Sequence, residues 1–169
     1  SRFLNGTLGM HLEVEAELRL PAEGANVALT LTSPKGENVV QHTCAAAEKL
    51  NLTSVQFQQG DVSALPFADG EFDLVLSLNG FHAFPDKEAA YRETFRVLKP
   101  GGTFCGCFYV SGEHKRTDWM IRHVYEPTKF FTPPYETVDS LRKRLQGMYA
   151  QVDVGSLKSI AWFICRKAD

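Results

Sequence analysis

Residues 72–110 constrain the fold most, because they read as a strand, a helix and a second strand in close succession. Three consecutive apolar residues inside Phe72–Ser77 predict a strand that is buried on both faces, as in a parallel sheet. Asp86–Leu98 predicts a helix that starts at an Asp86 cap and is stopped by Pro100-Gly101-Gly102. Thr103–Val110 predicts the next buried strand. A strand, helix and strand in this order imply a crossover connection and a parallel pair.

The alternation of strands and helices extends in both directions from this segment. Ser54–Gln59 predicts a short strand, and Ser33-Pro34 is typical of a helix start. Near the carboxyl terminus, a helix with one apolar side precedes two strands, Gln151–Val154 and Ser159–Arg166, which a short turn would join as an antiparallel hairpin. The sequence therefore predicts an α/β fold: a doubly wound, mostly parallel Rossmann-like sheet with a carboxyl-terminal antiparallel hairpin.

The first 32 residues permit two interpretations. His11–Leu20 alternates strictly between apolar and polar residues, which indicates a strand. Ala25–Thr32 also alternates, so that Leu12–Thr32 taken alone would form a β-hairpin. A helix is the alternative for His11–Leu20, and the choice stays open here.

Length and charge exclude several classes of protein. The 169 residues fit a single domain, residues 1–169, and the net charge of −2 gives no general attraction to nucleic acid or to an anionic membrane. The sequence shows no membrane-spanning or secretion segment, and its four cysteines match no zinc or disulfide spacing. We therefore expect a cytoplasmic protein without a metal. The cluster Arg142-Lys143-Arg144 predicts a solvated basic face.

Three motifs occur in a specific order within residues 60–110: GDVSALPFADGEFDLVLS, NGFHAFPD and RETFRVLKPGGTF. In this combination the chain resembles the class I S-adenosylmethionine-dependent methyltransferases, in particular those that act on small molecules. The resemblance implies S-adenosylmethionine as the cofactor, with S-adenosylhomocysteine as its product form.

The resemblance gives a role to the carboxylate at the tip of the strand that ends at Gly60. In proteins of this kind the acid corresponding to Asp61 accepts a hydrogen bond from the adenine amine, and the next backbone amide, here that of Val62, reaches a ring nitrogen. A carboxylate beside an N–H matches the donor and acceptor on that edge of adenine. Alternatively, Asp61 only caps a turn.

The segment after the second strand would form the floor beneath the methionine part of the cofactor. It begins at Ser77, and Asn79 could offer its amide there. His82 could face the transfer site as a catalytic base, or it could be a structural histidine.

Two parts of the family pattern are altered. A glycine-rich turn with an acid near its start should follow the first strand, but here only Gly6 and Gly9 survive, with no acid before Glu13. Leu31 falls where an acid would hold the two ribose hydroxyls. A leucine cannot accept those hydrogen bonds, and each buried hydroxyl left without a partner costs roughly 1–3 kcal/mol.

Residues 111–136 are rich in aromatic residues and proline, and we expect them to form a lid and the acceptor pocket. Trp119, Phe131 and Tyr135, together with Tyr109 before them, would bind a flat or apolar acceptor. The same aromatic side chains could instead simply cover the edge of the sheet.

Two functions follow from this pattern. The first is methyl transfer from S-adenosylmethionine to a small molecule, in which the protein mainly aligns the reactants and excludes water. The alternative is a methyltransferase-like domain with impaired cofactor binding, serving as a scaffold or subunit, or an incomplete chain. The sequence favours the enzyme and leaves the acceptor and the oligomeric state open.

Overall fold

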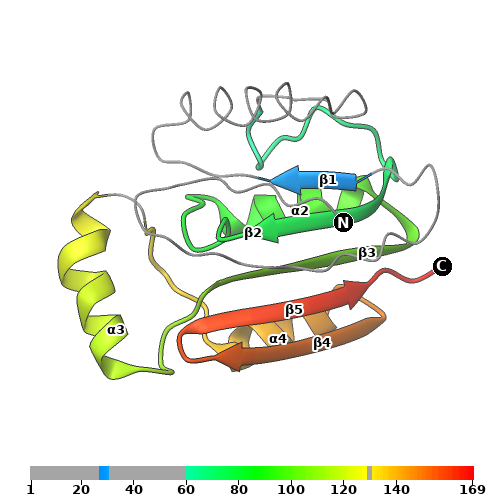
Figure 1. The fold of residues 1–169 in the computed structure, drawn as a ribbon. Coiled ribbons are helices and arrows are strands. Elements are labelled where there is room, and N and C mark those ends of the chain that lie inside the picture. Colours follow the sequence, from blue (N-terminus) through cyan, green and yellow to red (C-terminus); the bar gives the residue numbers. More distant parts are fainter. Residues whose placement is uncertain (1–26, 31–59, 129–130) are drawn as a thin grey trace, which may run out of the picture.

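A computed structural model of the chain describes residues 27–30, 60–128 and 131–169 (Figure 1). Five strands form one sheet in the order β1-β2-β3-β5-β4. The strands are β1 (Val27–Thr30), β2 (Phe72–Leu78), β3 (Leu98–Tyr109), β4 (Gln151–Leu157) and β5 (Ile160–Arg166). The helices are α2 (Lys87–Val97), α3 (Lys115–Met120), the π-helical turn η1 (Ile121–Tyr125), the 3₁₀ turn η2 (Glu126–Thr128) and α4 (Val138–Gln146).

The predicted strand–helix–strand unit is confirmed. β2 and β3 run parallel and α2 connects them. The Asp86 carboxylate caps α2 by accepting a hydrogen bond from the Ala89 amide at 2.9 Å. β3 starts at Leu98, five residues before the predicted start, because the chain pairs with β2 directly after the helix and the register then shifts across Pro100-Gly101-Gly102.

β1 confirms part of the predicted strand Ala25–Thr32. It pairs in parallel with β2, and Thr30 lies opposite Ser77. The first three strands thus run in the same direction, as a Rossmann-like sheet requires.

β4 and β5 form the predicted antiparallel hairpin, which is longer than expected. Only Lys158 and Ser159 separate the strands, and Lys158 has a positive φ of 53°. Gly155, which follows the predicted strand Gln151–Val154, lies within β4 opposite Trp162. Glycine fits there because the Trp162 indole occupies the space that a side chain would need.

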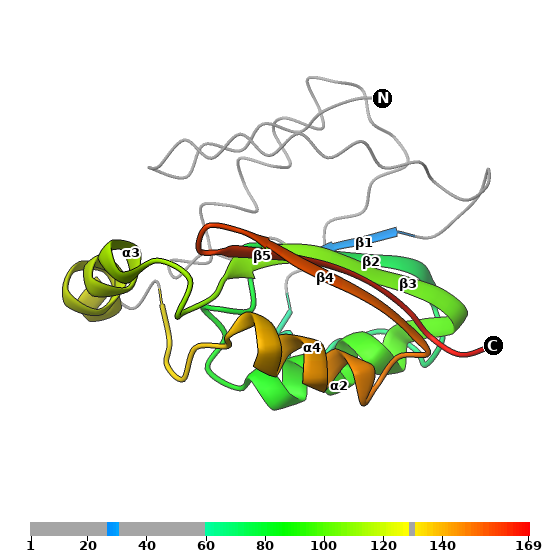
Figure 2. The same cartoon turned by 90° about the horizontal axis from the view of Figure 1, so that it is seen from below.

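Helices α2 and α4 cover the same face of the sheet (Figure 2). The core between them and the sheet is mostly aromatic, and its largest fully buried side chains include Phe81, Tyr91, Phe104, Phe108 and Phe163. The predicted helix with Leu141 and Leu145 on its inner side is confirmed as α4, which a Thr137–Ser140 capping box begins.

The basic cluster on α4 is a solvated face only in part, because Arg144 is held by carboxylates. Arg144 forms ion pairs with Glu136 and Glu88, at 2.8 and 2.6 Å. Arg142 donates to the Val154 carbonyl oxygen at 3.0 Å. Lys143 is exposed, and the Arg142 side chain is 43% exposed. The reason is that the end of the 111–136 segment returns to pack an acid against this helix, which the local sequence pattern does not reveal.

Several sequence predictions fall outside the described residues: the strand Ser54–Gln59, the segment His11–Leu20, the helix start at Ser33-Pro34, and the site candidates Gly6, Gly9 and Leu31. Within the described ranges no helix is long and apolar enough to cross a membrane. In the same ranges no group of three histidine, cysteine or acidic side chains is arranged to hold a metal ion.

Candidate cofactor and acceptor site

The carboxyl ends of the three parallel strands meet at one edge of the sheet. β1 ends at Thr30, β2 at Leu78 and β3 at Tyr109, and α3 lies at this end of the sheet (Figure 1). In open α/β sheets, ligands bind in the crevice beyond these ends. The candidate residues that follow β2 and β3 are therefore at the expected edge.

Asp61 lies in a tight turn and is exposed. Its Oδ1 accepts hydrogen bonds from the Ser63 amide at 2.8 Å and the Ser63 hydroxyl at 2.7 Å, and these bonds lower the pKa of the carboxyl group. The Ala64 amide donates to the Asp61 carbonyl oxygen at 3.0 Å. The turn-capping role considered from the sequence is thus present, and it fixes the direction of the carboxylate. Its use for adenine stays a prediction.

The loop after this turn is fastened to α2 by two side chains. The Glu93 carboxylate accepts a hydrogen bond from the Leu65 amide at 2.8 Å. Arg96 donates to the carbonyl oxygens of Leu65 and Phe67, at 3.0 and 2.8 Å, and pairs with Glu93. This explains why the Leu-Pro-Phe loop and the Arg-Glu-Thr-Phe-Arg helix occur together in the sequence.

Ser77 and Asn79 bracket the end of β2. The Ser77 side chain is 2% exposed, and its hydroxyl has no hydrogen-bond partner among the described residues. A side chain at Gly106, opposite it on β3, would overlap the Ser77 carbonyl oxygen, so only glycine allows this close approach. Asn79 has a positive φ of 54°, and its amide donates to the Cys107 carbonyl oxygen at 2.8 Å. The chain therefore turns sharply away from the sheet at Asn79.

His82 is buried just beyond this turn. Burial, together with the nearby positive charge of Lys87, lowers the pKa of His82 to about 4, so the ring is neutral at pH 7. The imidazole stacks on Phe131 with the ring centroids 4.3 Å apart. Its Nδ1 has no hydrogen-bond partner within the described ranges.

The structure brings three of the four predicted acceptor residues together with His82. Phe131 contacts Tyr109 edge-on with the centroids 5.4 Å apart, and Tyr109 contacts Tyr135 in the same way at 5.4 Å. We call His82, Phe131, Tyr109 and Tyr135 the ring cluster. Trp119 is not part of it, since this side chain is 60% exposed and stacks on His123.

Residues 111–128 contain a short helical segment, α3 to η2, that the sequence did not predict. Asp118 joins it to the end of β3, because its Oδ1 accepts from the Tyr109 hydroxyl at 2.8 Å and its Oδ2 from the Gly112 amide at 3.0 Å. Burial and the Asp118 charge raise the pKa of Tyr109. Tyr109 is therefore a neutral hydrogen-bond donor and not a general base.

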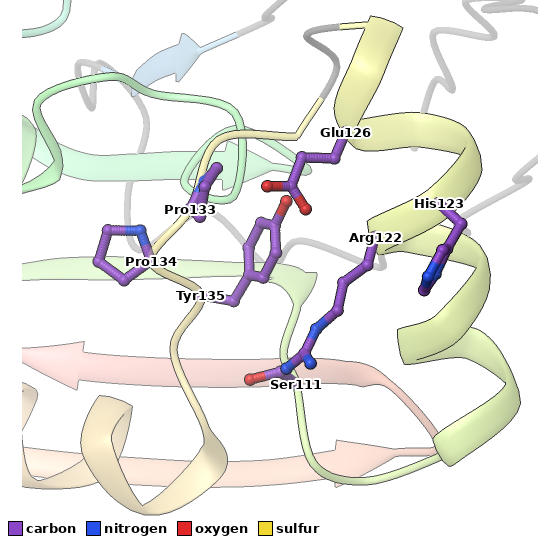
Figure 3. A pocket seen from close by; sticks show the side chains of 7 residues that line it. All are labelled: Ser111, Arg122, His123, Glu126, Pro133, Pro134 and Tyr135. Carbon is purple, nitrogen blue, oxygen red and sulfur yellow. The ribbon is translucent and has the colours of Figure 1, made fainter.

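An open groove of about 500 Å³ lies between this helical segment and residues 133–135 (Figure 3). Its lining residues are Ser111, Arg122, His123, Glu126, Pro133, Pro134 and Tyr135. In Figure 3 the Tyr135 hydroxyl points toward the Glu126 carboxylate, and Arg122 extends from η1 toward Ser111. Burial and the charge of Glu126 raise the pKa of Tyr135 to about 12. Sequence reasoning found only Tyr135 among these residues.

Two described candidates fit a nucleoside cofactor: Asp61, assigned to adenine, and Ser77, assigned to the methionine part. The Asp61 carboxylate is exposed, and only its Oδ1 is used by the described part of the chain. The buried Ser77 hydroxyl has no partner in that part and lies at the end of β2. Both observations leave polar atoms available where a ligand of this fold would lie.

Three parallel strands extended by an antiparallel hairpin define a Rossmann-like fold, with the candidate residues at the carboxyl ends of the parallel strands. A family model described as a methyltransferase domain matches residues 17–106, more than half of the 169 residues. The chain belongs to this family of methyltransferase domains.

Curated relatives match about half of the chain or somewhat more. A fatty-acid O-methyltransferase from Mycolicibacterium smegmatis is 43% identical over 108 residues, which cover 61% of this chain and 38% of the relative. An uncharacterized protein of Mycobacterium tuberculosis is 43% identical over 88 residues, covering 51% and 31%. An uncharacterized methyltransferase of Bacillus subtilis, YcgJ, is 32% identical over 88 residues, covering 52% and 35%. The match thus spans 31% to 38% of the length of these relatives.

Solved structures share the fold over most of the chain. The YcgJ protein superposes with a TM-score of 0.63 at 16% identity, covering 85% of this chain and 82% of YcgJ. A SAM-dependent methyltransferase from Thermotoga maritima gives a TM-score of 0.62 at 17% identity, covering 88% and 84%. These similarities confirm the predicted Rossmann-like class.

Proposed function

We propose that this domain transfers a methyl group from S-adenosylmethionine to a small-molecule acceptor. The chain belongs to a methyltransferase family, and the candidate residues after β2 and β3 gather at the carboxyl edge where ligands of this fold bind.

The observation that carries the proposal is the fixed loop that starts at Asp61. Arg96 and Glu93 hold this loop to α2, and Ser63 holds the carboxylate in one orientation. A lowered pKa keeps the Asp61 carboxylate ionised and therefore an acceptor only, which suits the adenine amine. The Val62 amide lies next to it in the chain and would meet the neighbouring ring nitrogen.

The cofactor, when bound, supplies a methyl group already activated on a sulfonium. The chain then has to align the acceptor and exclude water. Where the acceptor must lose a proton, His82 is the candidate to take it up, because its ring is neutral at pH 7 and its Nδ1 has no partner among the described residues. Its lowered pKa makes it a weak base, so its contribution to the rate should be small. Phe131, Tyr109 and Tyr135 would form the apolar wall beside the acceptor.

Calorimetric titration with S-adenosylmethionine and S-adenosylhomocysteine tests the proposal. We expect saturable binding of both, weakened at least about tenfold by Asp61→Ala through loss of a hydrogen bond to a charged group. Asp153→Ala is the matched control, because Asp153 is exposed on the edge strand β4. Absence of binding by both compounds would contradict the proposal and leave the methyltransferase-like scaffold as the better account.

A further inference from the structure

We propose that the groove beside η1 binds a carboxylate on the methyl acceptor, and that Arg122 is the residue that selects it. This inference rests on the proposed function, since it assigns the acceptor class of that same site.

The position of the groove suits an acceptor. Ser111 lies two residues beyond the end of β3, so the groove opens at the carboxyl edge of the sheet. The ring cluster runs continuously from His82, near the end of β2, to Tyr135, which lines the groove. Tyr135 and Phe131 are half-buried, so an acceptor with its polar end in the groove could lie along their exposed edges toward His82.

The guanidinium of Arg122 can bind a ligand in this groove, because the described carboxylates do not pair with it. It forms no ion pair with the part of the chain that the structure describes, and its side chain is exposed. Arg96 and Arg144, in contrast, are both held by carboxylates. A guanidinium presents paired N–H donors that match the two oxygens of a carboxylate.

Two acids, Asp118 and Glu126, have other neighbours than Arg122. Asp118 accepts from the Tyr109 hydroxyl and the Gly112 amide. Glu126 faces the Tyr135 hydroxyl (Figure 3) and lies at the rim as the opposing negative charge. Glu126 should therefore weaken the binding of an anion. Removing the charge of Glu126 should strengthen anion binding, whereas removing the charge of Arg122 should weaken it.

His123, which also lines the groove, is oriented by the backbone. His123 Nδ1 lies 2.8 Å from the Trp119 carbonyl oxygen, which can only accept, so Nδ1 carries the proton. In this neutral tautomer Nε2 has no hydrogen to donate to an anion, so we assign the anion site to Arg122 alone. The rings of Tyr135 and Tyr109 would lie beside the apolar body of the acceptor.

The test is an NMR titration of the ¹⁵N-labelled protein with hexanoate, and with hexan-1-ol as the neutral counterpart. We expect hexanoate to shift the amides of the groove saturably. Arg122→Gln should weaken hexanoate binding about tenfold, or ~1.4 kcal/mol. Glu126→Gln should strengthen it severalfold, and neither variant should change the response to hexan-1-ol. Arg116→Gln, an exposed arginine on α3 outside the groove, should behave like the wild type.

Failure of this inference is distinguishable from failure of the proposed function. No saturable hexanoate shift in the wild type, or equal affinity in wild type and Arg122→Gln, overturns the carboxylate site. Each sample is also titrated with S-adenosylhomocysteine. If that compound binds while Arg122→Gln has no effect on hexanoate, only the acceptor class is wrong. If the affinity for hexanoate depends on Arg122 but S-adenosylhomocysteine does not bind, the anion site is supported and the proposed methyl transfer is contradicted.

Discussion

Arg96 donates a hydrogen bond to the Leu65 carbonyl oxygen at 3.0 Å, and this contact ties the loop after Asp61 to helix α2. The same guanidinium also binds the Phe67 carbonyl oxygen and the Asp69 and Glu93 carboxylates. Helix α2 thus sets the position of the proposed adenine contact.

Arg96→Gln should loosen this loop. We expect the free energy of unfolding, measured by urea denaturation, to fall by about 2 kcal/mol, because several charge-assisted hydrogen bonds are lost. Affinity for S-adenosylhomocysteine should fall as well. Arg92→Gln on the exposed side of the same helix is the control. Equal stability of the two variants would show that the loop does not depend on Arg96.

Asp118→Ala should release the helical segment from the end of β3. It removes the acceptor of both the Tyr109 hydroxyl and the Gly112 amide. We expect a loss of about 1–2 kcal/mol in unfolding free energy, and faster hydrogen exchange at the Gly112 amide. Unchanged exchange at that amide would mean that Asp118 does not anchor the segment.

His82 should make stability depend on pH. Its pKa is lowered from 6.5 to about 4 in the folded protein, so the unfolded chain takes up a proton first as the pH falls. The stabilisation is complete above pH 6.5 and is lost as the pH falls toward 4, by at most about 3 kcal/mol. His82→Phe keeps an aromatic ring for Phe131 and removes the titration. Urea denaturation of both proteins across this range should give a steeper pH dependence for the wild type, and parallel curves would refute the assignment.

Glu136 and Arg144 should be strongly coupled. Glu136 is 9% exposed, and Arg144 also lies over the Tyr91 ring, 4.9 Å from its centroid. Arg144→Gln should cost about 3 kcal/mol, because it leaves the buried Glu136 carboxylate without its cation. Glu136→Gln should cost less, because Arg144 keeps its ion pair with Glu88. The double variant should cost clearly less than the sum in a double-mutant cycle. Additive costs would show that the pair acts independently.

The sequence was informative where structure is local. Three apolar residues in a row and an aspartate cap were sufficient for β2 and α2, since burial on both faces and capping are properties of a few neighbouring residues. The hairpin could be predicted because only a short turn separates two segments with the pattern of a strand. Helix α3 was missed because Lys115–Met120 has no apolar periodicity and no side-chain cap.

The site could be predicted only in part, because it is built from distant segments. Tyr109, Phe131 and Tyr135 were chosen from composition. The contact of Phe131 with His82 and Tyr109 depends on how residues 131–135 return across the sheet edge. Arg122 was missed because it stands in a short π-helical turn, Ile121–Tyr125, that no sequence pattern indicated. Arg144 was misjudged because its partner Glu136 approaches from the preceding loop.

The backbone amide of Val62 provides the most direct test of the central claim, that adenine binds at the Asp61 turn. In an NMR titration with S-adenosylhomocysteine we expect this amide signal to shift saturably, with the shift reduced in Asp61→Asn and retained in Asp153→Asn. A saturable titration that moves other amides and leaves Val62 unchanged would contradict the assignment of this turn to the cofactor.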